Sequence, residues 1–156
     1  MYRWLILCLA GLPAALLACS GDDDGSSAAL VLDHLSARES AYHSAVGTLP
    51  GMDAIRSETS AYAGDMHGLL DEMNGECRDM EHCCSAMGGY TMEDMIGVMD
   101  RMQDLIDAHH ARMDAMNTLD EMRAECESHH RAMQELLGEM SGMIPGGGMM
   151  GHRRGM

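Results

Sequence analysis

The sequence contains no phenylalanine and no lysine, and its one tryptophan, Trp4, lies close to the first residue. Without lysine, arginine is the only fixed positive side chain, and the formal net charge is −15 at pH 7. So acidic a surface repels nucleic acid and anionic lipid and attracts cations. Without phenylalanine, another large apolar residue must fill the core, and the nineteen methionines are suited to that task.

Signatures of catalysis are also missing. The sequence holds no set of nucleophile, base and oxyanion donors, no phosphate-binding loop and no Cys-x-x-Cys-His motif for covalent haem. We therefore expect a protein that is not an enzyme. A haem bound without covalent attachment, between His109 or His129 and a methionine, stays open as an alternative.

The N-terminal stretch MYRWLILCLAGLPAALLACS joins one early charge, Arg3, to an apolar run that is too short to span a bilayer comfortably. This pattern is typical of a secretory signal peptide. It ends on Leu16-Leu17-Ala18-Cys19, which resembles the lipobox of bacterial lipoproteins. The resemblance implies removal of residues 1–18, a lipid anchor on Cys19 and, because Ser20 follows, delivery to the periplasmic face of the outer membrane. An uncleaved signal anchor is the alternative.

Composition divides the rest of the chain into three parts. Residues 19–28 include the polar run SGDDDGSSA and are expected to form a flexible tether to the membrane. Residues 29–143 carry regular apolar spacing and suffice for one small domain. Residues 144–156 are rich in glycine and methionine, and we expect them to form a disordered tail.

The sequence repeats itself at an offset of 67 residues. The stretch RSETSAYAGDMHGLLDEM, which begins at Arg56, aligns without a gap on RAECESHHRAMQELLGEM, which begins at Arg123. Both stretches have the apolar spacing of a helix. A duplicated helical hairpin predicts an all-α protein, an antiparallel up-down four-helix bundle.

Heptad spacing supports this prediction in four segments, where core residues recur at alternating three- and four-residue steps. The first two stripes are Leu32, Leu35, Glu39, Tyr42, Val46 and Leu49, then Met52, Ile55, Thr59, Tyr62, Met66, Leu69 and Met73. The second two are Met92, Met95, Met99, Met102, Ile106, His109, Met113 and Met116, then Leu119, Met122, Cys126, His129, Met133, Leu136, Met140 and Met143. We interpret the methionines as core filler.

Several core positions on these stripes are polar. In an antiparallel hairpin, residues at one height have numbers with a constant sum, which pairs Glu39 with Tyr62 and His109 with Cys126. A twofold axis along the bundle would bring the two hairpins' polar positions to the same height. We call the residues at this height the polar layer, and they include one apolar residue, Ile106. The set is Glu39, Tyr42, Thr59, Tyr62, Ile106, His109, Cys126 and His129.

Burial of polar groups costs about 1–3 kcal/mol for each group without a partner, so the polar layer must be satisfied in some way. One solution is a network in which Glu39 bonds Tyr62 and a histidine, while Cys126 behaves as a small hydrophobe. Such a layer would fix the register and pairing of the helices. The chain would then be a non-catalytic envelope protein of structural or interaction type.

The second solution is a metal ion held by His109, Cys126 and His129, with Glu39 or Met133 close by. Two imidazoles and a thiolate with a carboxylate suit zinc, whereas the same set with a thioether suits copper. We expect the metal site, with copper first and zinc second, in a protein that buffers or carries the ion. The hydrogen-bonded network remains the alternative.

Polar residues beside the stripes are expected to surround this site. The constant-sum rule pairs His43 with Glu58 in the first copy and His110 with Glu125 in the second. Such pairs are ordinary on exposed helix flanks and contribute little to stability. With the phenols they form the expected outer set around the metal: Tyr42, Tyr62, His43, His110, Glu58 and Glu125.

Residues 75–90, with the sequence GECRDMEHCCSAMGGY, have no counterpart in the second copy. A straight helix through this segment would displace the second hairpin from the twofold register. We therefore expect helix 2 to break near Asn74-Gly75 and residues 76–90 to form a cap over one end of the bundle.

Cysteines in this insertion are expected to be oxidised in the periplasm. Because adjacent cysteines seldom bond to each other, Cys77 is expected to pair with Cys83 or Cys84, with Cys83 as the first choice. A surface metal site made of Cys77, His82 and Cys83 is the alternative.

Overall fold

The structure is a computed structural model that describes residues 27–81 and 90–144. Its four helices are α1 (Ser27–Thr48), α2 (Met52–Glu81), α3 (Met92–Ala115) and α4 (Leu119–Met143). Helices are the only regular elements in the described ranges. The predicted all-α four-helix bundle is therefore confirmed. The expected signal peptide, Cys19 and, apart from buried Ile144, the expected tail lie outside the described residues.

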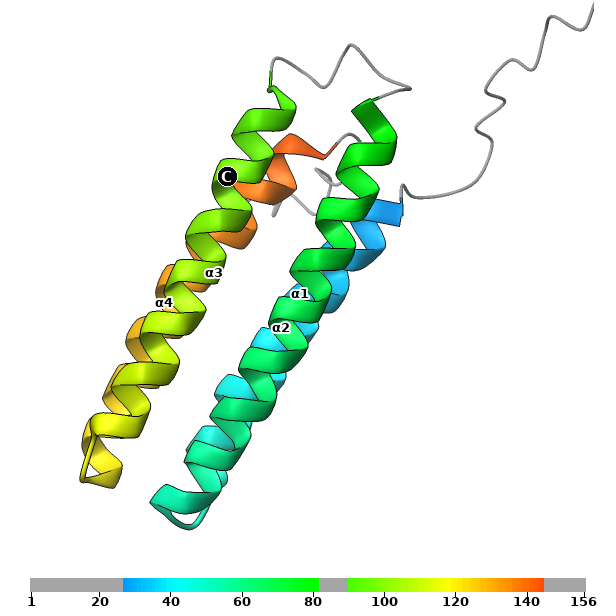
Figure 1. The fold of residues 1–156 in the computed structure, drawn as a ribbon. Helices are drawn as coiled ribbons and strands as arrows, with labels where there is room; N and C mark the ends of the chain where they lie inside the picture. The colour runs from blue at the N-terminus through cyan, green and yellow to red at the C-terminus, as the bar shows by residue number, and fades with distance from the viewer. Residues whose placement is uncertain (1–26, 82–89, 145–156) are drawn as a thin grey trace, which may run out of the picture.

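Neighbouring helices run antiparallel, and both hairpin turns lie at the same end of the bundle (Figure 1). Each helix packs against its two neighbours, including α1 against α4, and α2 also touches α4 across the diagonal. The order α1–α2–α3–α4 around the axis relates the two hairpins by an approximate twofold, as the repeat predicts. None of the described helices has the length and apolar character needed to cross a membrane.

Local sequence explains where α3 and α4 begin. Thr91 caps α3 by accepting a hydrogen bond from the Asp94 amide, while the Asp94 carboxylate accepts one from the Thr91 amide. These hydrogen bonds lower the pKa of Asp94. Thr118 caps α4 through the Glu121 amide. The caps fix where α3 and α4 start and therefore the height of the residues that follow.

The core follows the predicted stripes closely. Methionine supplies much of the buried surface in α2, α3 and α4, which agrees with its expected role as core filler. One difference recurs in both copies, because Leu70 and Leu137 are buried where the heptad rule selects Leu69 and Leu136. A straight helix drifts against a strict seven-residue repeat, which moves the buried side onto the next leucine.

The expected break in helix 2 is wrong, because α2 continues past Asn74-Gly75 to Glu81. Cys77 extends the buried stripe of Met66, Leu70 and Met73, and its side chain is fully buried. The gain from burying one more turn against α3 outweighs the cost of a glycine inside the helix, which is about 1 kcal/mol relative to alanine. At the other end, α1 begins at Ser27 and so includes two residues assigned to the tether.

The disulfide between Cys77 and Cys83 stays a prediction, because Cys83 and Cys84 lie outside the described residues. Cys77 itself is a free thiol in this structure. Its sulfur lies 2.9 Å from the Met95 sulfur across the α2–α3 interface.

Candidate metal site in a buried polar layer

The polar layer lies in the core, at the height that the repeat predicts. Glu39, Tyr42, Thr59, Tyr62, Ile106 and His109 are fully buried, and His129 and Cys126 are 1% and 2% exposed. Glu39 Oε2 lies 3.8 Å from His129 Nε2, across the interface between the hairpins. The expected convergence of the carboxylate, phenols, imidazoles and thiol is therefore confirmed, while their role in binding metal stays a prediction.

The four aromatic rings of the polar layer obey the internal repeat. Tyr42 and Tyr62 stack with centroids 4.2 Å apart, and their repeat counterparts His109 and His129 stack at 4.0 Å. Each tyrosine hydroxyl then meets the histidine exactly one repeat later in the chain, at 2.8 Å from Nε2 in both cases. Each pair joins a residue to its own repeat counterpart, so the approximate twofold axis passes between the tyrosine and the histidine of each pair.

The pair Tyr62–His129 is connected to a buried carboxylate. Tyr62 donates its hydroxyl proton to Glu39 Oε2, and His130 Nδ1 lies 2.9 Å from Glu39 Oε1. His130 is about a quarter exposed, so the network reaches solvent on this side. The repeat and the heptad spacing do not predict this contact between His130 and the carboxylate.

Hydrogen-bond accounting assigns the tautomer of His129. Tyr62 has one proton and gives it to Glu39, so the phenol oxygen can only accept from His129 Nε2. His129 therefore carries its proton on Nε2 and a bare lone pair on Nδ1. That Nδ1 is buried and has no hydrogen-bond partner, one of two such side-chain atoms among the described residues; the other is Asn74 Oδ1.

The pair Tyr42–His109 ends differently. His109 Nδ1 faces Glu125 Oε1 at 3.2 Å, and the same carboxylate oxygen accepts a hydrogen bond from Arg112. Because a carboxylate only accepts, neutral His109 places its proton on Nδ1, and Nε2 accepts from Tyr42. The Tyr42 hydroxyl also lies 2.9 Å from the Thr59 hydroxyl, which donates to the Ile55 carbonyl. Both nitrogens of His109 are therefore occupied, and the two histidines are opposite tautomers.

Burial keeps both imidazoles neutral. Desolvation, with a smaller contribution from the stacked His109, lowers the pKa of His129 to about 3. Desolvation also lowers the pKa of His109, although the hydrogen bond to Glu125 opposes that change. The pKa values of Tyr42 and Tyr62 are raised, again chiefly by desolvation, so both phenols keep their protons. Neutral imidazole is the form that binds metal ions.

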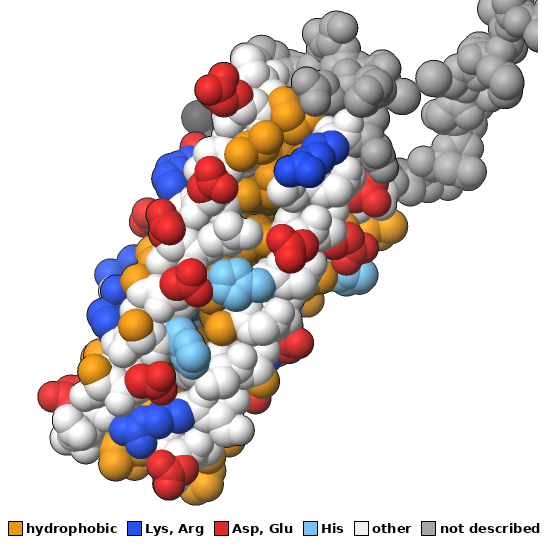
Figure 2. Space-filling view, viewed as in Figure 1, with side chains coloured by type: hydrophobic (Ala, Val, Ile, Leu, Met, Phe, Trp, Pro, Cys, Tyr) orange, Lys and Arg blue, Asp and Glu red, His pale blue; other side chains and the backbone are white. Residues whose placement is uncertain are grey.

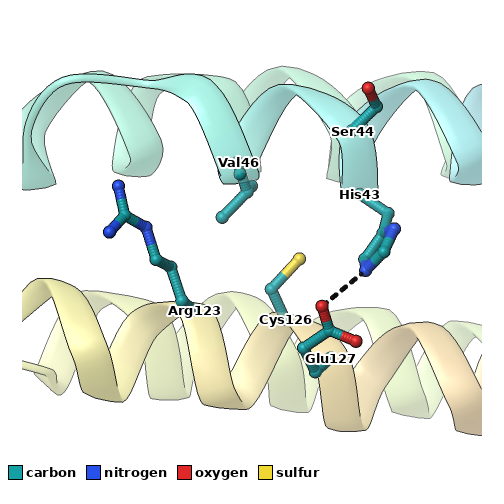
Figure 3. Close-up of a pocket in the computed structure, with 7 residues that line it drawn as sticks. His43, Ser44, Val46, Arg123, Cys126 and Glu127 are labelled. Carbon is teal, nitrogen blue, oxygen red and sulfur yellow. Dashed lines mark hydrogen bonds and ion pairs between the residues drawn. The ribbon is translucent and has the colours of Figure 1, made fainter.

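A pocket of about 390 Å³ between α1 and α4 gives access to the layer from one side. The Cys126 sulfur points from α4 toward α1, between Arg123 and the ion pair of His43 with Glu127 (Figure 3). Desolvation and the charge of Glu39 raise the pKa of the Cys126 thiol to about 12. The thiol is therefore protonated in the protein without metal, and a ligand that binds its sulfur must displace that proton.

The expected flank pairs are wrong in both copies. His43 contacts Glu127 on α4 rather than Glu58, and His110 contacts Ser60 on α2 rather than Glu125. The constant-sum rule gives the height of a residue but not which neighbouring helix its side chain faces. The remaining partners follow the same pattern, with Glu58 bound by Arg38, His67 by Asp107, and Glu125 by His109 and Arg112.

These flank groups mix with the acidic surface. On the face shown in Figure 2, acidic side chains lie along the length of the bundle with fewer arginines among them, and histidines lie near its middle. Two of the flank histidines also contact each other: the rings of His43 on α1 and His130 on α4 stack with their centroids 4.0 Å apart.

The structure revises the ligand set that the sequence predicts. In the part of the chain that is described, no group of three or more His, Cys, Asp and Glu side chains is arranged to hold a metal ion. The reason is visible in the network: the Nε2 atoms of His109 and His129 both bond tyrosines, and His109 Nδ1 bonds Glu125. The donors left in the layer are His129 Nδ1, which has no partner, and the Cys126 sulfur, which interacts with the Tyr42 hydroxyl; the buried thioether of Met133 lies one turn further along α4.

Comparison of the chain with protein-family models, with curated proteins and with solved structures found no match. The function must therefore be inferred from the geometry of this molecule.

Proposed function

We propose that the chain is a lipid-anchored envelope protein that buffers or carries Cu(I), with His129 Nδ1 and the Cys126 thiolate as its ligands. The observation that carries this proposal is the buried lone pair on His129 Nδ1, which has no hydrogen-bond partner. Cys126 precedes His129 by three residues on α4, which is about 4.5 Å of helical rise, so one helical turn supplies both donors.

The groups behind His129 are those expected around a metal ligand. A ligating histidine usually gives its other N–H to a carboxylate, a carbonyl or water, which fixes the tautomer and orients the ring. Here His129 gives its Nε2 proton to Tyr62, which in turn bonds Glu39. This support holds Nδ1 free and keeps it unprotonated.

Copper fits these donors better than zinc. Zn²⁺ in proteins is almost always held by four ligands in a tetrahedron, and the polar layer offers one imidazole and one thiol. Cu(I) selects soft thiolate and thioether donors and accepts low coordination numbers. Met133 is fully buried one turn after His129 and supplies the nearest thioether on the same helix.

The test is an anaerobic titration of the full mature chain with Cu(I) against a chromogenic chelator. We expect His129→Ala to weaken the site about 100-fold or more and Cys126→Ala to abolish it. His109→Ala is the matched control, because His109 has equal burial and an equal bond to tyrosine but no free nitrogen. It should change the affinity less than about tenfold. Equal losses in the two histidine variants would rule out the proposed ligand.

A pH series adds a second criterion. Because the thiol must lose its proton on binding, the apparent affinity for Cu(I) should rise with pH, by about tenfold per unit below the thiol pKa. In the Cys126→Ala variant this dependence should vanish with the site. Affinity that does not depend on pH would show that the thiol is not a ligand.

The second candidate is an envelope protein whose polar layer serves packing alone. It is favoured by the network itself, which leaves only His129 Nδ1 unsatisfied in the polar layer. A chain that binds no Cu(I) and whose melting temperature does not change on addition of copper or zinc would support this candidate over the metal site.

Location is a separate part of the proposal and rests on the lipobox-like residues Leu16-Leu17-Ala18-Cys19. Cys19→Ala should prevent lipidation and release the protein from the membrane fraction of the bacterial envelope. Retention of this variant in the membrane fraction would favour an uncleaved signal anchor instead.

A further inference from the structure

Sulfur atoms dominate the core at the end of the bundle opposite the hairpin turns. Between the polar layer and that end, α1 contributes only aliphatic side chains, whereas the other three helices contribute mainly methionine. The buried sulfur residues there are Met66, Met73 and Cys77 on α2, Met95, Met99 and Met102 on α3, and Met133, Met140 and Met143 on α4. The single thiol of this set is Cys77.

Two of these sulfurs meet directly across the α2–α3 interface. Cys77 Sγ lies 2.9 Å from Met95 Sδ, and the two side chains are 0% and 1% exposed. Met140 lies at the same height on α4, because the pairing that sets His109 opposite Cys126 also sets Met95 opposite Met140. Met140 is fully buried as well. Sulfurs from three helices therefore converge on one level of the core.

An unsatisfied acceptor lies one helical turn away on α2. Asn74 Oδ1 is the second buried side-chain atom without a hydrogen-bond partner among the described residues, and it precedes Cys77 by one turn on α2. A purely hydrophobic packing of methionines gives no reason for a thiol and a bare amide oxygen to be buried together here. The buried thiol is accounted for if it releases its proton and takes an ion in its place.

We propose that Cys77, Met95 and Met140 form a second Cu(I) site, made of sulfur alone. One thiolate and two thioethers are soft donors that select Cu(I), and the single amide oxygen of Asn74 does not suffice for hard cations such as Ca²⁺ or Mg²⁺. Binding forms the Cu–S bond to Cys77 and releases the thiol proton, with no change in the oxidation state of copper or sulfur. Ag(I), which has the same preference, should bind in the same way.

Burial agrees with that proton balance. Desolvation raises the pKa of the Cys77 thiol to about 11, so the residue is protonated without metal. The site lies about 21 Å along α3 from the polar layer, measured as fourteen residues of helical rise between positions 95 and 109. The two sites are therefore independent, and this proposal extends the proposed function without depending on the ligands of the first site.

The experiment is an anaerobic Cu(I) titration of the full mature chain, with the cysteines reduced. The parent chain should bind two equivalents of Cu(I). The Cys77→Ala variant should bind one equivalent in the polar layer, and the Cys126→Ala variant should bind one equivalent at Cys77. X-ray absorption should report sulfur-only coordination in the Cys126→Ala variant and mixed nitrogen and sulfur coordination in Cys77→Ala. If the equivalent assigned to Cys77 is absent while that of Cys126 is present, this proposal fails and the first stands. The reverse result means that the first fails and this one stands.

Met95→Leu tests the thioether without removing the thiol, and a change between side chains of similar volume should leave the fold intact. It should weaken the second equivalent about tenfold or more. Met113→Leu, an equally buried methionine near the hairpin turns, is the matched control and should have no effect. If replacement of Cys83 and Cys84 removes this equivalent while Met95→Leu does not, the ligands are the neighbouring cysteines and the proposed site of Cys77, Met95 and Met140 is wrong.

Discussion

Each of the two Tyr–His pairs of the polar layer joins a tyrosine to its counterpart one repeat later, but the two pairs have different surroundings. Tyr42–His109 connects through Glu125 to Arg112 at the surface, and every nitrogen in this pair has a partner. Tyr62–His129 connects through Glu39 to His130, and its last nitrogen has none.

The difference follows from the position of one carboxylate in each network. Glu125 bonds its histidine directly, whereas Glu39 takes the tyrosine proton and reaches its histidine only through the phenol. The first arrangement places the imidazole proton on Nδ1 and the second places it on Nε2. Two histidines of one layer, each bonded to the tyrosine one repeat earlier, can thus be a spectator and a histidine prepared to bind a ligand.

The largest difference between the two networks should appear when each carboxylate is removed. Glu39→Ala leaves the hydroxyl of buried Tyr62 without its acceptor and should lower the free energy of unfolding by about 3 kcal/mol. Glu125→Ala should cost about 1 kcal/mol, because Glu125 is 13% exposed and water can replace it. Urea unfolding of the metal-free chain measures both values. Equal losses would mean that the two carboxylates contribute equally to stability, which would contradict this difference between the networks.

A swap across the approximate twofold should have the next largest effect. Tyr62→His and His129→Tyr each break one buried bond and should each cost about 2 kcal/mol. The double variant restores a phenol opposite an imidazole and should recover about 1 kcal/mol or more of the summed loss. A double-mutant cycle by urea unfolding measures this coupling, and strict additivity would contradict a direct bond between the two positions.

Acid should destabilise the metal-free protein through its neutral histidines. The pKa of His129 is about 3 in the folded state and 6.5 ordinarily, and that of His109 is also lowered, so the unfolded chain binds more protons below pH 6.5. Stability is therefore complete above pH 6.5 and falls as the pH drops toward 3, by up to about 1.4 kcal/mol per pH unit for each histidine.

In the His129→Gln variant, the free energy of unfolding should depend less steeply on pH, by an amount that corresponds to about one proton. Urea unfolding at several pH values measures this dependence. The exposed His67→Gln variant is the control and should retain the slope of the parent chain. A parent stability that does not change between pH 6.5 and 4 would contradict the neutral assignment of both histidines.

The smallest effect is expected outside the polar layer. Asp107→Ala removes the partner of His67 on the exposed α2–α3 flank and should change the free energy of unfolding by less than about 0.5 kcal/mol. Thermal melting at neutral pH is sufficient to test this. A loss comparable with that of Glu39→Ala would show that the flank contacts, and not the buried network, determine stability.

The fold was predictable because two regular spacings in the sequence determine it. The heptad step identifies the buried face, and the 67-residue offset brings Tyr42 to His109 and Tyr62 to His129. Burial of these four residues and their convergence with Glu39 follow from those periods and from helix geometry alone. The free energy of burying an apolar stripe is large enough to enforce that register.

The parts that sequence reasoning missed depend on choices between states of similar energy. The break expected near Gly75 does not occur, because the stripe that continues to Cys77 has a partner in Met95 that the repeat does not predict. Flank residues such as His43 can face either neighbouring helix at nearly equal cost. Tautomers depend on individual proton positions, so the free nitrogen of His129 becomes apparent only from the hydrogen-bond network.

The bond of each tyrosine to the histidine one repeat later has a consequence for how such a bundle could be assembled. In a dimer of two identical hairpins, a residue beside the symmetry axis meets its own copy, so phenol would face phenol or imidazole would face imidazole. Covalent fusion of the two halves frees each site from that identity. A donor can then face an acceptor of a different kind, and one half can acquire a chemical task that its twin does not share.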